Sequence, residues 1–542
     1  MSEVELVIRG GRVVDGTGNP WRHADVAVDH GSVVAVTAAG HGPSAARVLD
    51  ADGHVVAPGF VDIHSHSDLA LLARPGAAEK LRQGVTTEVV GNCGISVVPA
   101  TRESTEQLRE YALPVLGFPE IPWDWSDVSS YLDRITEMRT AVNVATYVGL
   151  GSVRCAVTGF ASDSPSTAER TLMMELVRVA LDQGAVGLSS GLVYAPGSYS
   201  SAEEIWELVA EAARVGALYS THMRDQGDGF LESVGEALEV GRRTGASVQV
   251  AHHKVVGRRN WGQVVESLRM LENARRDGID AGSDVYPYLA GSTTMTALLP
   301  DWALAGGHDA LVERLRDPAA RSRIKGDWVT GIPQWDNRVS SLGFENIVIS
   351  YVSTPESEDL VGLSVAAAAA RRGKAREVGD FLLDLLVHEN CSLGNIQVAC
   401  SEKDLRQVMR HETTCFGSDG LLVGGKPHPR LHGTFPRILG EYVREVRLLP
   451  VELAIRKMTS QAARRLSLAG IGLIESGYRA DLVVFDPESV AGPATYEEPT
   501  LAPVGIRDVI VGGQLAVEQG ETTGVRAGVA LRRSATGRSR TR

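Results

Sequence analysis

The sequence predicts an α/β fold, because short apolar strands alternate with amphipathic helical segments through the middle of the 542-residue chain. Eight strands of this kind predict a (β/α)8 (TIM) barrel. Short strands with glycine turns at both ends of the chain predict a small β-sandwich domain that both termini build together. Two separate β modules are the less economical alternative, because each would bury little core.

The predicted barrel strands are short, largely apolar runs. They are Pro58–His66, Val85–Val90, Val142–Val148, Ala185–Ser190, Ala217–His222, Ser247–His252, Ile279–Tyr286 and Thr413–Asp419. Helical segments around Ala168–Gln183, Ala202–Val215 and Phe230–Thr244 lie between successive strands.

The interval before the last strand is far too long for one barrel repeat. We therefore expect an insertion over about residues 297–400, of the kind that often acts as a lid. The predicted domains are residues 1–57 with 465–530 for the sandwich and 58–464 for the barrel. Residues 531–542 are basic and poor in apolar residues, so we expect a disordered tail.

Composition narrows the class of partner. A net charge of -13 argues against nucleic acid and against an anionic membrane surface. Five cysteines in so long a chain are not a disulfide framework. Neither a signal-peptide pattern nor an apolar run of about 18 residues occurs, so we expect a cytoplasmic protein. The sequence leaves open whether it forms a homo-oligomer.

Metal ligands or acid–base groups follow five of the eight strands. They are His64 and His66, Cys93, His222, His252 and Asp419. The carboxyl ends of barrel strands form the active sites of such enzymes. A chance scatter of polar residues would not recur at the same end of successive strands, and thiolate together with imidazole selects zinc.

Each residue alone has a plainer interpretation. The two histidines of His64-Ser65-His66 share one face of a strand, but most such pairs simply face water. A lone cysteine such as Cys93 is usually an inert core residue, and His222 could be a satisfied core histidine. Asp419 could be a turn residue or a helix N-cap. Its functional interpretation is a general base for a water that a bound metal activates.

Six motifs together resemble the amidohydrolase superfamily. They are Pro58–His66, Gly91–Gly94, His222–Arg224, Ala251–Lys254, Asp284–Tyr288 and Gly417–Gly420. Within the superfamily they resemble the N-acyl-D-amino-acid deacylase (D-aminoacylase) group, and the similarity covers nearly the whole chain. Many amidohydrolases bridge two metals with a carboxylated lysine on a later strand. The segment Ala185–Gly191 has no lysine, whereas Cys93 fits the deacylase pattern.

The resemblance implies a site with one tightly bound zinc, held by Cys93, His222 and His252. His64, His66 and Asp419 would border a second, weaker metal position. It also implies a carboxylate-binding group, which comprises Lys254, Tyr286 and Arg430 with Ser292 assisting. Strand geometry supports a place for Lys254 in the site, because Lys254 and His252 share one face of the strand. We therefore expect His252 to point into the site and the adjacent His253 to pack on the other side. The alternative for Arg430 is a solvated loop arginine.

We therefore predict zinc-dependent hydrolysis of the amide bond of N-acyl-D-amino acids, with Asp419 moving the proton. One alternative is a cyclic-amide hydrolase of hydantoinase or dihydroorotase type, and another is a non-catalytic relative that only binds. The side-chain preference stays open. Met223, Leu289, Met295 and Leu298 suggest an apolar substrate, whereas a basic residue from the insertion would favour D-Glu or D-Asp.

Overall fold

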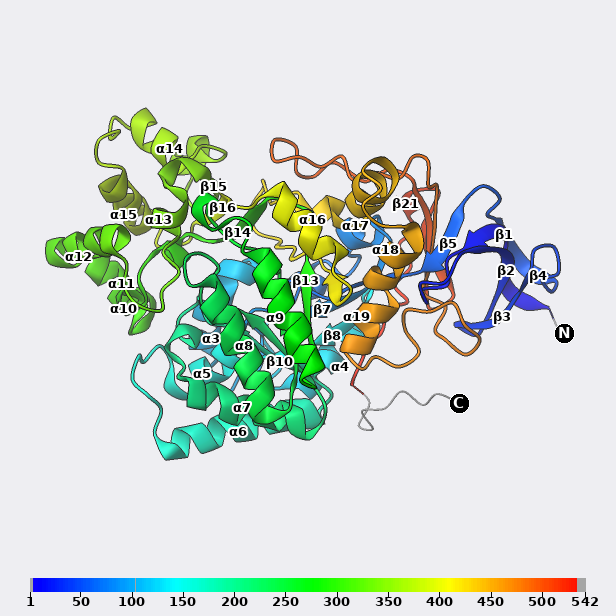
Figure 1. Ribbon diagram of the computed structural model, residues 1–542, viewed down its shortest axis with the longest axis horizontal. Coiled ribbons are helices and arrows are strands. Elements are labelled where there is room, and N and C mark those ends of the chain that lie inside the picture. Colours follow the sequence, from blue (N-terminus) through cyan, green and yellow to red (C-terminus); the bar gives the residue numbers. More distant parts are fainter. Residues whose placement is uncertain (1–2, 103, 534–542) are drawn as a thin grey trace.

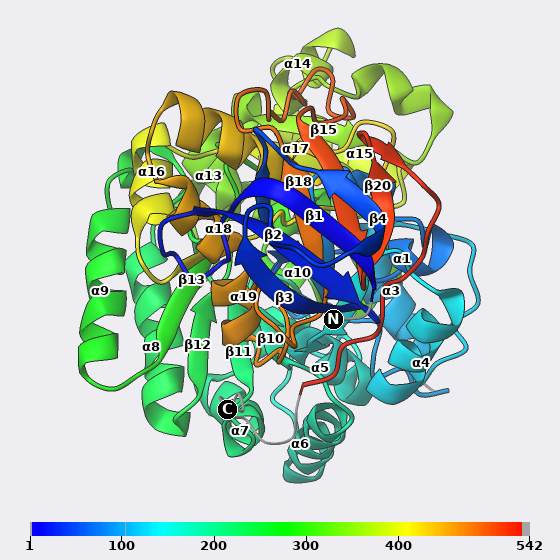
Figure 2. The ribbon, with the colours of Figure 1, turned by 90° about the vertical axis from the view of Figure 1, so that its right-hand side faces the viewer.

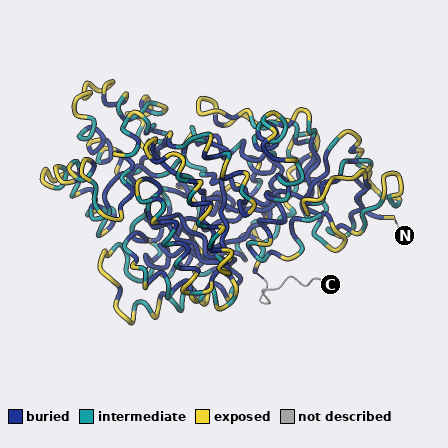
Figure 3. Tube along the Cα trace, viewed as in Figure 1, coloured by how far each residue is buried: buried dark blue, intermediate teal, exposed yellow. Residues whose placement is uncertain are grey.

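The chain forms an α/β structure that extends along one axis (Figure 1). The computed structural model describes residues 3–102 and 104–533. Parallel strands and their helices lie in the middle, a sheet built from both chain ends lies to one side, and a helical insertion projects from the other. Buried residues are concentrated in the central strands, and exposed residues mark the outer helices and loops (Figure 3). No helix among the described residues is long and apolar enough to cross a membrane.

The two chain ends share one nine-stranded sheet. Its strands are β1 (Val4–Val13), β2 (Arg22–Asp29), β3 (Ser32–Ala38), β4 (Ala45–Asp50), β5 (Val55–Pro58), β18 (Leu482–Phe485), β19 (Ile506–Val511), β20 (Gln514–Glu518) and β21 (Glu521–Thr522). The order is β21-β20-β19-β18-β5-β1-β2-β3, and β4 also pairs with β1. The ends join where β5 runs antiparallel to β18, with Pro58 opposite Leu482. Figure 2 shows this sheet in front of the parallel strands.

The central strands pair in parallel. Three of them form one sheet, which comprises β6 (Phe60–Asp62), β7 (Val85–Val90) and β8 (Asn143–Thr146). Six form another, which comprises β9 (Val148–Gly149), β10 (Gly187–Gly191), β11 (Leu218–His222), β12 (Ser247–Val250), β13 (Ala281–Val285) and β17 (Thr414–Phe416). Tyr147 alone separates β8 from β9, and a parallel bridge joins Ser65, after β6, to Gly420, after β17. The segment after β17 therefore lies beside the segment after β6.

Helices follow most of these strands and cover their outer side (Figures 1 and 2). They are α1 (Ala70–Ala73), α2 (Ala78–Leu81), α3 (Thr105–Leu116), α4 (Val128–Met138), α5 (Leu150–Thr158), α6 (Thr167–Asp182), α7 (Ala202–Arg214), α8 (Phe230–Thr244), α9 (Val264–Arg276), α16 (Glu402–Arg410), α17 (Arg430–Arg437), the π-helical η6 (Ile438–Glu445), α18 (Val451–Met458) and α19 (Ser460–Arg465), with short 3-10 turns η1 (Gly197–Tyr199) and η2 (Arg258–Asn260). Local signals fix their starts, since Ser166 and Glu169 form a capping box on α6 and Ser201 caps α7.

The insertion occupies residues 290–400 and has its own core. Its strands β14 (Ala290–Thr294), β15 (Ile347–Tyr351) and β16 (Gly394–Val398) form an antiparallel sheet in the order β14-β16-β15. Its helices are η3 (Met295–Leu298), α10 (Asp301–Leu304), α11 (Gly307–Arg316), α12 (Pro318–Thr330), α13 (Arg338–Leu342), η4 (Phe344–Asn346), η5 (Pro355–Leu360), α14 (Val365–Arg371) and α15 (Val378–His388). It begins earlier than residue 297, because β14 pairs with β16 along its whole length.

The last described residues run along the central strands. The amide of Leu531 donates to the Val144 carbonyl at 2.7 Å, and that of Arg533 donates to the Gly184 carbonyl at 3.0 Å. Residues 531–533 of the expected disordered tail are thus hydrogen-bonded to the rest of the chain, and residues 534–542 lie outside the described residues.

Candidate active site

All six predicted metal ligands and acid–base groups lie at the carboxyl ends of the parallel strands. His64 and His66 follow β6, Cys93 follows β7, His222 ends β11, His252 follows β12 and Asp419 follows β17. All six are buried. Cys93, His252 and Asp419 have φ angles of 55°, 35° and 49°. Non-glycine residues seldom adopt positive φ, and such backbone conformations concentrate at functional sites.

Nitrogen, sulfur and oxygen atoms converge there in two overlapping groups. One group is His64, Cys93 and His252, and the other is His64, His66 and Asp419, with one ligand atom per residue and all atoms of a group within 4.8 Å of one another. His64 Nε2 lies 3.3 Å from Cys93 Sγ and 3.5 Å from Asp419 Oδ1, so this histidine joins the two groups.

His222 borders the first group. Its Nδ1 lies 3.0 Å from His252 Nε2, which in turn lies 3.6 Å from Cys93 Sγ. Among the described residues, His222 Nε2 and His66 Nδ1 are buried without a hydrogen-bond partner. Such a concentration of soft and borderline ligand atoms is the donor set that zinc prefers. The residues present therefore fit a metal site.

Electrostatics favours the anionic forms of Cys93 and Asp419, although, against the effect of burial, the same two anions raise the pKa of His64 and of His66 above its ordinary value. Burial alone would raise the pKa of Cys93, but His64 and hydrogen bonds from His222 and His252 lower it well below its ordinary value. Burial would likewise raise the pKa of Asp419, but Arg430 and His64 hold it well below the usual range. Both shifts favour the anionic form.

The predicted carboxylate-binding residues lie beside Asp419. Arg430 Nη1 is 2.8 Å from Asp419 Oδ2, and its guanidinium carbon lies 4.7 Å from the centre of the Tyr286 ring. Lys254 Nζ lies 5.4 Å from the same ring. Arg430 is 1% exposed, so the solvated-loop alternative does not describe it. The carbonyl of Ser292 accepts a hydrogen bond from Arg430 Nη2 at 3.2 Å.

Comparison with known proteins places this arrangement in a family. The model of the amidohydrolase family matches residues 47–517. The chain belongs to the amidohydrolase family.

Several amidohydrolases are similar over the whole chain. The N-acyl-D-glutamate deacylase of Alcaligenes xylosoxydans xylosoxydans is 37% identical over 98% of this chain and 97% of its own length. The D-aminoacylase of the same organism is 34% identical, with 98% of each chain covered. A crystal structure of N-acyl-D-glutamate deacylase from Bordetella bronchiseptica, with zinc and a phosphonate inhibitor, has a TM-score of 0.82 at 34% identity and covers 98% of this chain and 100% of that one. D-hydantoinase, at 14% identity and a TM-score of 0.55, is similar in fold.

Asp284 is a supporting residue that sequence reasoning did not single out for the site of this amidohydrolase. Its Oδ1 lies 3.0 Å from His64 Nδ1 and accepts from the His252 amide at 2.8 Å. A carboxylate on the far nitrogen of a metal-binding histidine fixes the tautomer that leaves Nε2 free to ligate. The signal for it was its place at the carboxyl end of a predicted strand, which the structure shows as β13 (Ala281–Val285).

The insertion supplies Arg338 to the same surroundings. Arg338 Nη2 donates to Gln226 Oε1 at 3.0 Å, and Gln226 Nε2 lies 3.1 Å from His252 Nδ1. Arg338 also pairs with Asp336 at 2.5 Å. No local pattern could have indicated Arg338, because its partner lies 112 residues away in the chain.

A buried cation lies under the site. Lys80 Nζ is 2.6 Å from Asp62 Oδ2 and 3.1 Å from Glu88 Oε2, and all three side chains are 0% exposed. Asp62 Oδ1 accepts from the amide of Ser418 at 2.8 Å, so this cluster fixes the residue that precedes Asp419. Burial alone would lower the pKa of Lys80, but the two carboxylates outweigh it and raise that pKa above its usual value.

Proposed function

We propose that this amidohydrolase uses zinc to hydrolyse the amide bond of N-acyl-D-amino acids. Water adds across the bond, which releases the acyl group as a carboxylate and the amine as a free D-amino acid. The observation that carries the proposal is the position of Cys93 Sγ, which lies 3.3 Å from His64 Nε2 and 3.6 Å from His252 Nε2. Lys254 and Arg430, which can bind a carboxylate, lie nearby. The names of the relatives that are similar over the whole chain support it.

The finer architecture belongs to the same proposal. We infer that β6 to β13 and β17 close into a (β/α)8 barrel, with β8 and β9 as one bent strand. The bridge between Ser65 and Gly420 supports closure, because it links the first and last strands. We also infer that the nine-stranded sheet folds as a β-sandwich, with domains at residues 1–57 with 465–530 and at 58–464.

Cys93, His222 and His252 would hold the tightly bound zinc, and His64, His66 and Asp419 would border a second, weaker position. A bound zinc would polarise the scissile carbonyl and favour ionisation of the attacking water. Burial and the charge of Lys254 lower the pKa of His252 to about 3, so its imidazole is neutral, as a ligand must be.

Asp419 moves the proton. Its carboxylate accepts a proton from the attacking water and then gives it to the leaving nitrogen, which departs as an amine. Oδ1 lies 3.2 Å from His66 Nε2, and Oδ2 lies 2.8 Å from Arg430 Nη1. These contacts fix the carboxylate next to the ligand atoms before substrate binds.

Lys254, Tyr286 and Arg430 would bind the α-carboxylate of the substrate. Among the described residues the Tyr286 hydroxyl is buried without a hydrogen-bond partner, so it has a free donor. Arginine binds carboxylates through two parallel hydrogen bonds, which fixes orientation as well as position. With the carboxylate held, the mirror-image substrate would direct its amide away from the metal.

The test combines zinc content with hydrolysis of matched N-acetyl-D- and N-acetyl-L-amino acids (Met, Leu, Phe, Glu and Asp). We expect turnover of D-forms alone, and its loss in Asp419→Ala with zinc retained. Asp359→Ala, which removes an exposed carboxylate on the insertion, should behave as wild type. Bound zinc without turnover of any D-form would refute the deacylase proposal, and hydrolysis of hydantoin or dihydroorotate instead would establish the cyclic-amide alternative.

A further inference from the structure

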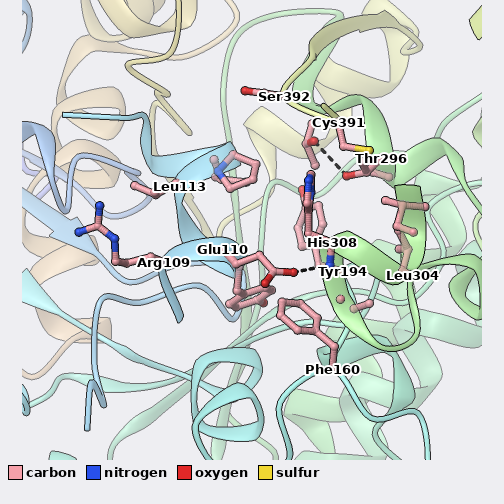
Figure 4. A pocket seen from close by; sticks show the side chains of 18 of the residues that line it. Arg109, Glu110, Leu113, Phe160, Tyr194, Thr296, Leu304, His308, Cys391 and Ser392 are labelled. Carbon is pink, nitrogen blue, oxygen red and sulfur yellow. Dashed lines mark hydrogen bonds between the residues drawn. The ribbon is translucent and has the colours of Figure 1, made fainter. Parts of the chain in front are cut away.

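A cavity of about 510 Å³ lies between α3, the loop after β10 and the insertion (Figure 4). Apolar side chains from these three elements line it, namely Leu113, Val115, Val193, Leu304 and Leu311, together with Phe160 from the loop after α5. Its size lies within the range of ~300–1,000 Å³ that is typical of small-molecule sites. Nothing in the proposed catalytic machinery uses it.

Three of the polar residues that line this cavity interact with one another. Glu110 accepts from the backbone amide of His308, and His308 Nε2 lies 3.0 Å from Asn390 Oδ1. Burial raises the pKa of the Cys391 thiol to about 12, so this residue is neutral. Glu106, Arg109 and Asp309 share the lining with the apolar side chains, so an aliphatic ligand would contact only the apolar part of the surface.

Tyr194 borders both the cavity and the candidate active site. Its ring lines the cavity and also packs edge-on against the His222 ring, with 5.3 Å between the ring centres. Its hydroxyl lies 2.8 Å from Thr293 Oγ1 on β14 of the insertion. Ile95, two residues after Cys93, lines the cavity as well. The cavity thus ends one aromatic ring away from a predicted zinc ligand.

Substrate geometry directs the acyl group toward this cavity. A secondary amide is trans, so its acyl chain and its α-carbon leave the amide at opposite ends. The carboxylate-binding residues Tyr286 and Arg430 follow β13 and β17, whereas Tyr194 and His222 follow or end β10 and β11. The strand order β17-β13-β12-β11-β10 places these two groups on either side of β12 and its His252.

We propose that this cavity binds the acyl chain of the substrate, and that the preferred substrates carry medium-length aliphatic acyl groups rather than acetyl. The inference rests on the proposed deacylase function and names the acyl class that it would take. An acetyl group would leave most of the cavity empty, whereas each further methylene transfers apolar surface from water to the walls that Leu113 and Leu304 line.

The experiment measures kcat/KM for N-acetyl, N-butanoyl, N-hexanoyl and N-octanoyl forms of the D-amino acid that is hydrolysed fastest. We expect kcat/KM to rise about two- to fourfold per methylene until the chain fills the cavity. Octanoate, the corresponding product, should also inhibit more strongly than acetate. A flat or falling series in a wild-type enzyme that hydrolyses the acetyl form would overturn the proposal and leave the deacylase function intact.

Filling the cavity provides the matched test. Leu113→Trp and Leu304→Trp add bulk from opposite walls, and each should abolish the chain-length preference while N-acetyl turnover stays within about twofold of wild type. Leu172→Trp is the control, because Leu172 is 50% exposed on α6, away from the cavity. Folding of each variant is checked by circular dichroism. If both cavity variants fold and keep the wild-type series, the proposal is wrong; if the wild-type enzyme hydrolyses no N-acyl-D-amino acid, the deacylase function itself has failed.

Discussion

Removing the buried cation under the site should destabilise the protein strongly. Lys80→Met keeps the length and the apolar stem of the side chain but leaves Asp62 and Glu88 without their partner charge. Both carboxylates are 0% exposed, so water cannot replace the ammonium group. Breaking a buried ion pair costs about 3–5 kcal/mol. We therefore expect a fall of this size in the free energy of unfolding, a shift of a few hundred- to several thousand-fold in the folding equilibrium.

The insertion offers a matched control. Lys325 Nζ lies 2.7 Å from Asp380 Oδ2, nearly the same distance, but the two side chains are 40% and 36% exposed. Pairs of this kind contribute about 0–1 kcal/mol. Lys325→Met should therefore lose no more than about 1 kcal/mol, since solvent screens the remaining carboxylate.

Urea denaturation followed by far-ultraviolet circular dichroism measures both variants. The linear dependence of the unfolding free energy on urea gives the difference from wild type. If the free energy of unfolding falls no further in Lys80→Met than in Lys325→Met, burial does not increase the contribution of the Lys80 ion pair to stability, and the reasoning is refuted. Ser418 depends on the same cluster through Asp62, so turnover by folded Lys80→Met should also decrease.

Three further changes test the site. Arg430→Lys should raise KM for D-substrates roughly 10- to 100-fold with zinc content unchanged, because lysine cannot form the two parallel bonds of a guanidinium; an unchanged KM would remove Arg430 from the carboxylate site. Gly94→Ala should lower zinc content and melting temperature, because a Cβ at this position would lie 2.5 Å from the Gly191 amide nitrogen. Gly53→Ala is the control, since Gly53 has a similar positive φ but open space around it, and this variant should lower the melting temperature less. Burial lowers the pKa of Lys254 to about 8, so KM should rise above pH 8 as the lysine loses its positive charge, and a KM that is flat to pH 10 would contradict this role.

Repetition made the strand ends predictable. Each βα unit places its carboxyl end at the same edge, so Cys93 and His252 could be predicted to lie close together although they are 159 positions apart in the chain. The length of chain before Thr414 likewise predicted an insertion. Its exact start could not be predicted, because Ala290 belongs to the insertion through a pairing with Val398 that no local pattern encodes.

Contacts between distant segments limited the rest of the prediction. Lys80, on the short helix α2, looks like an ordinary exposed lysine in sequence, and its burial follows from two acidic residues on neighbouring strands. Arg338 reaches Gln226 because of how the insertion docks, which its own sequence does not encode. The cavity beside Tyr194 is formed by three separate elements, so it exists only in the folded chain.

The sheet shared by the two termini affects the order of events during biosynthesis. Strand β5 leaves the ribosome early, but its neighbour β18 begins at Leu482, after nearly the whole catalytic region has been made. At ~5–20 residues per second, one edge of β5 waits roughly tens of seconds for its partner. During that time it presents unpaired backbone groups of the kind that invite wrong pairing. Expression at lower temperature or with added chaperones should therefore improve the soluble yield of this chain more than it improves its specific activity.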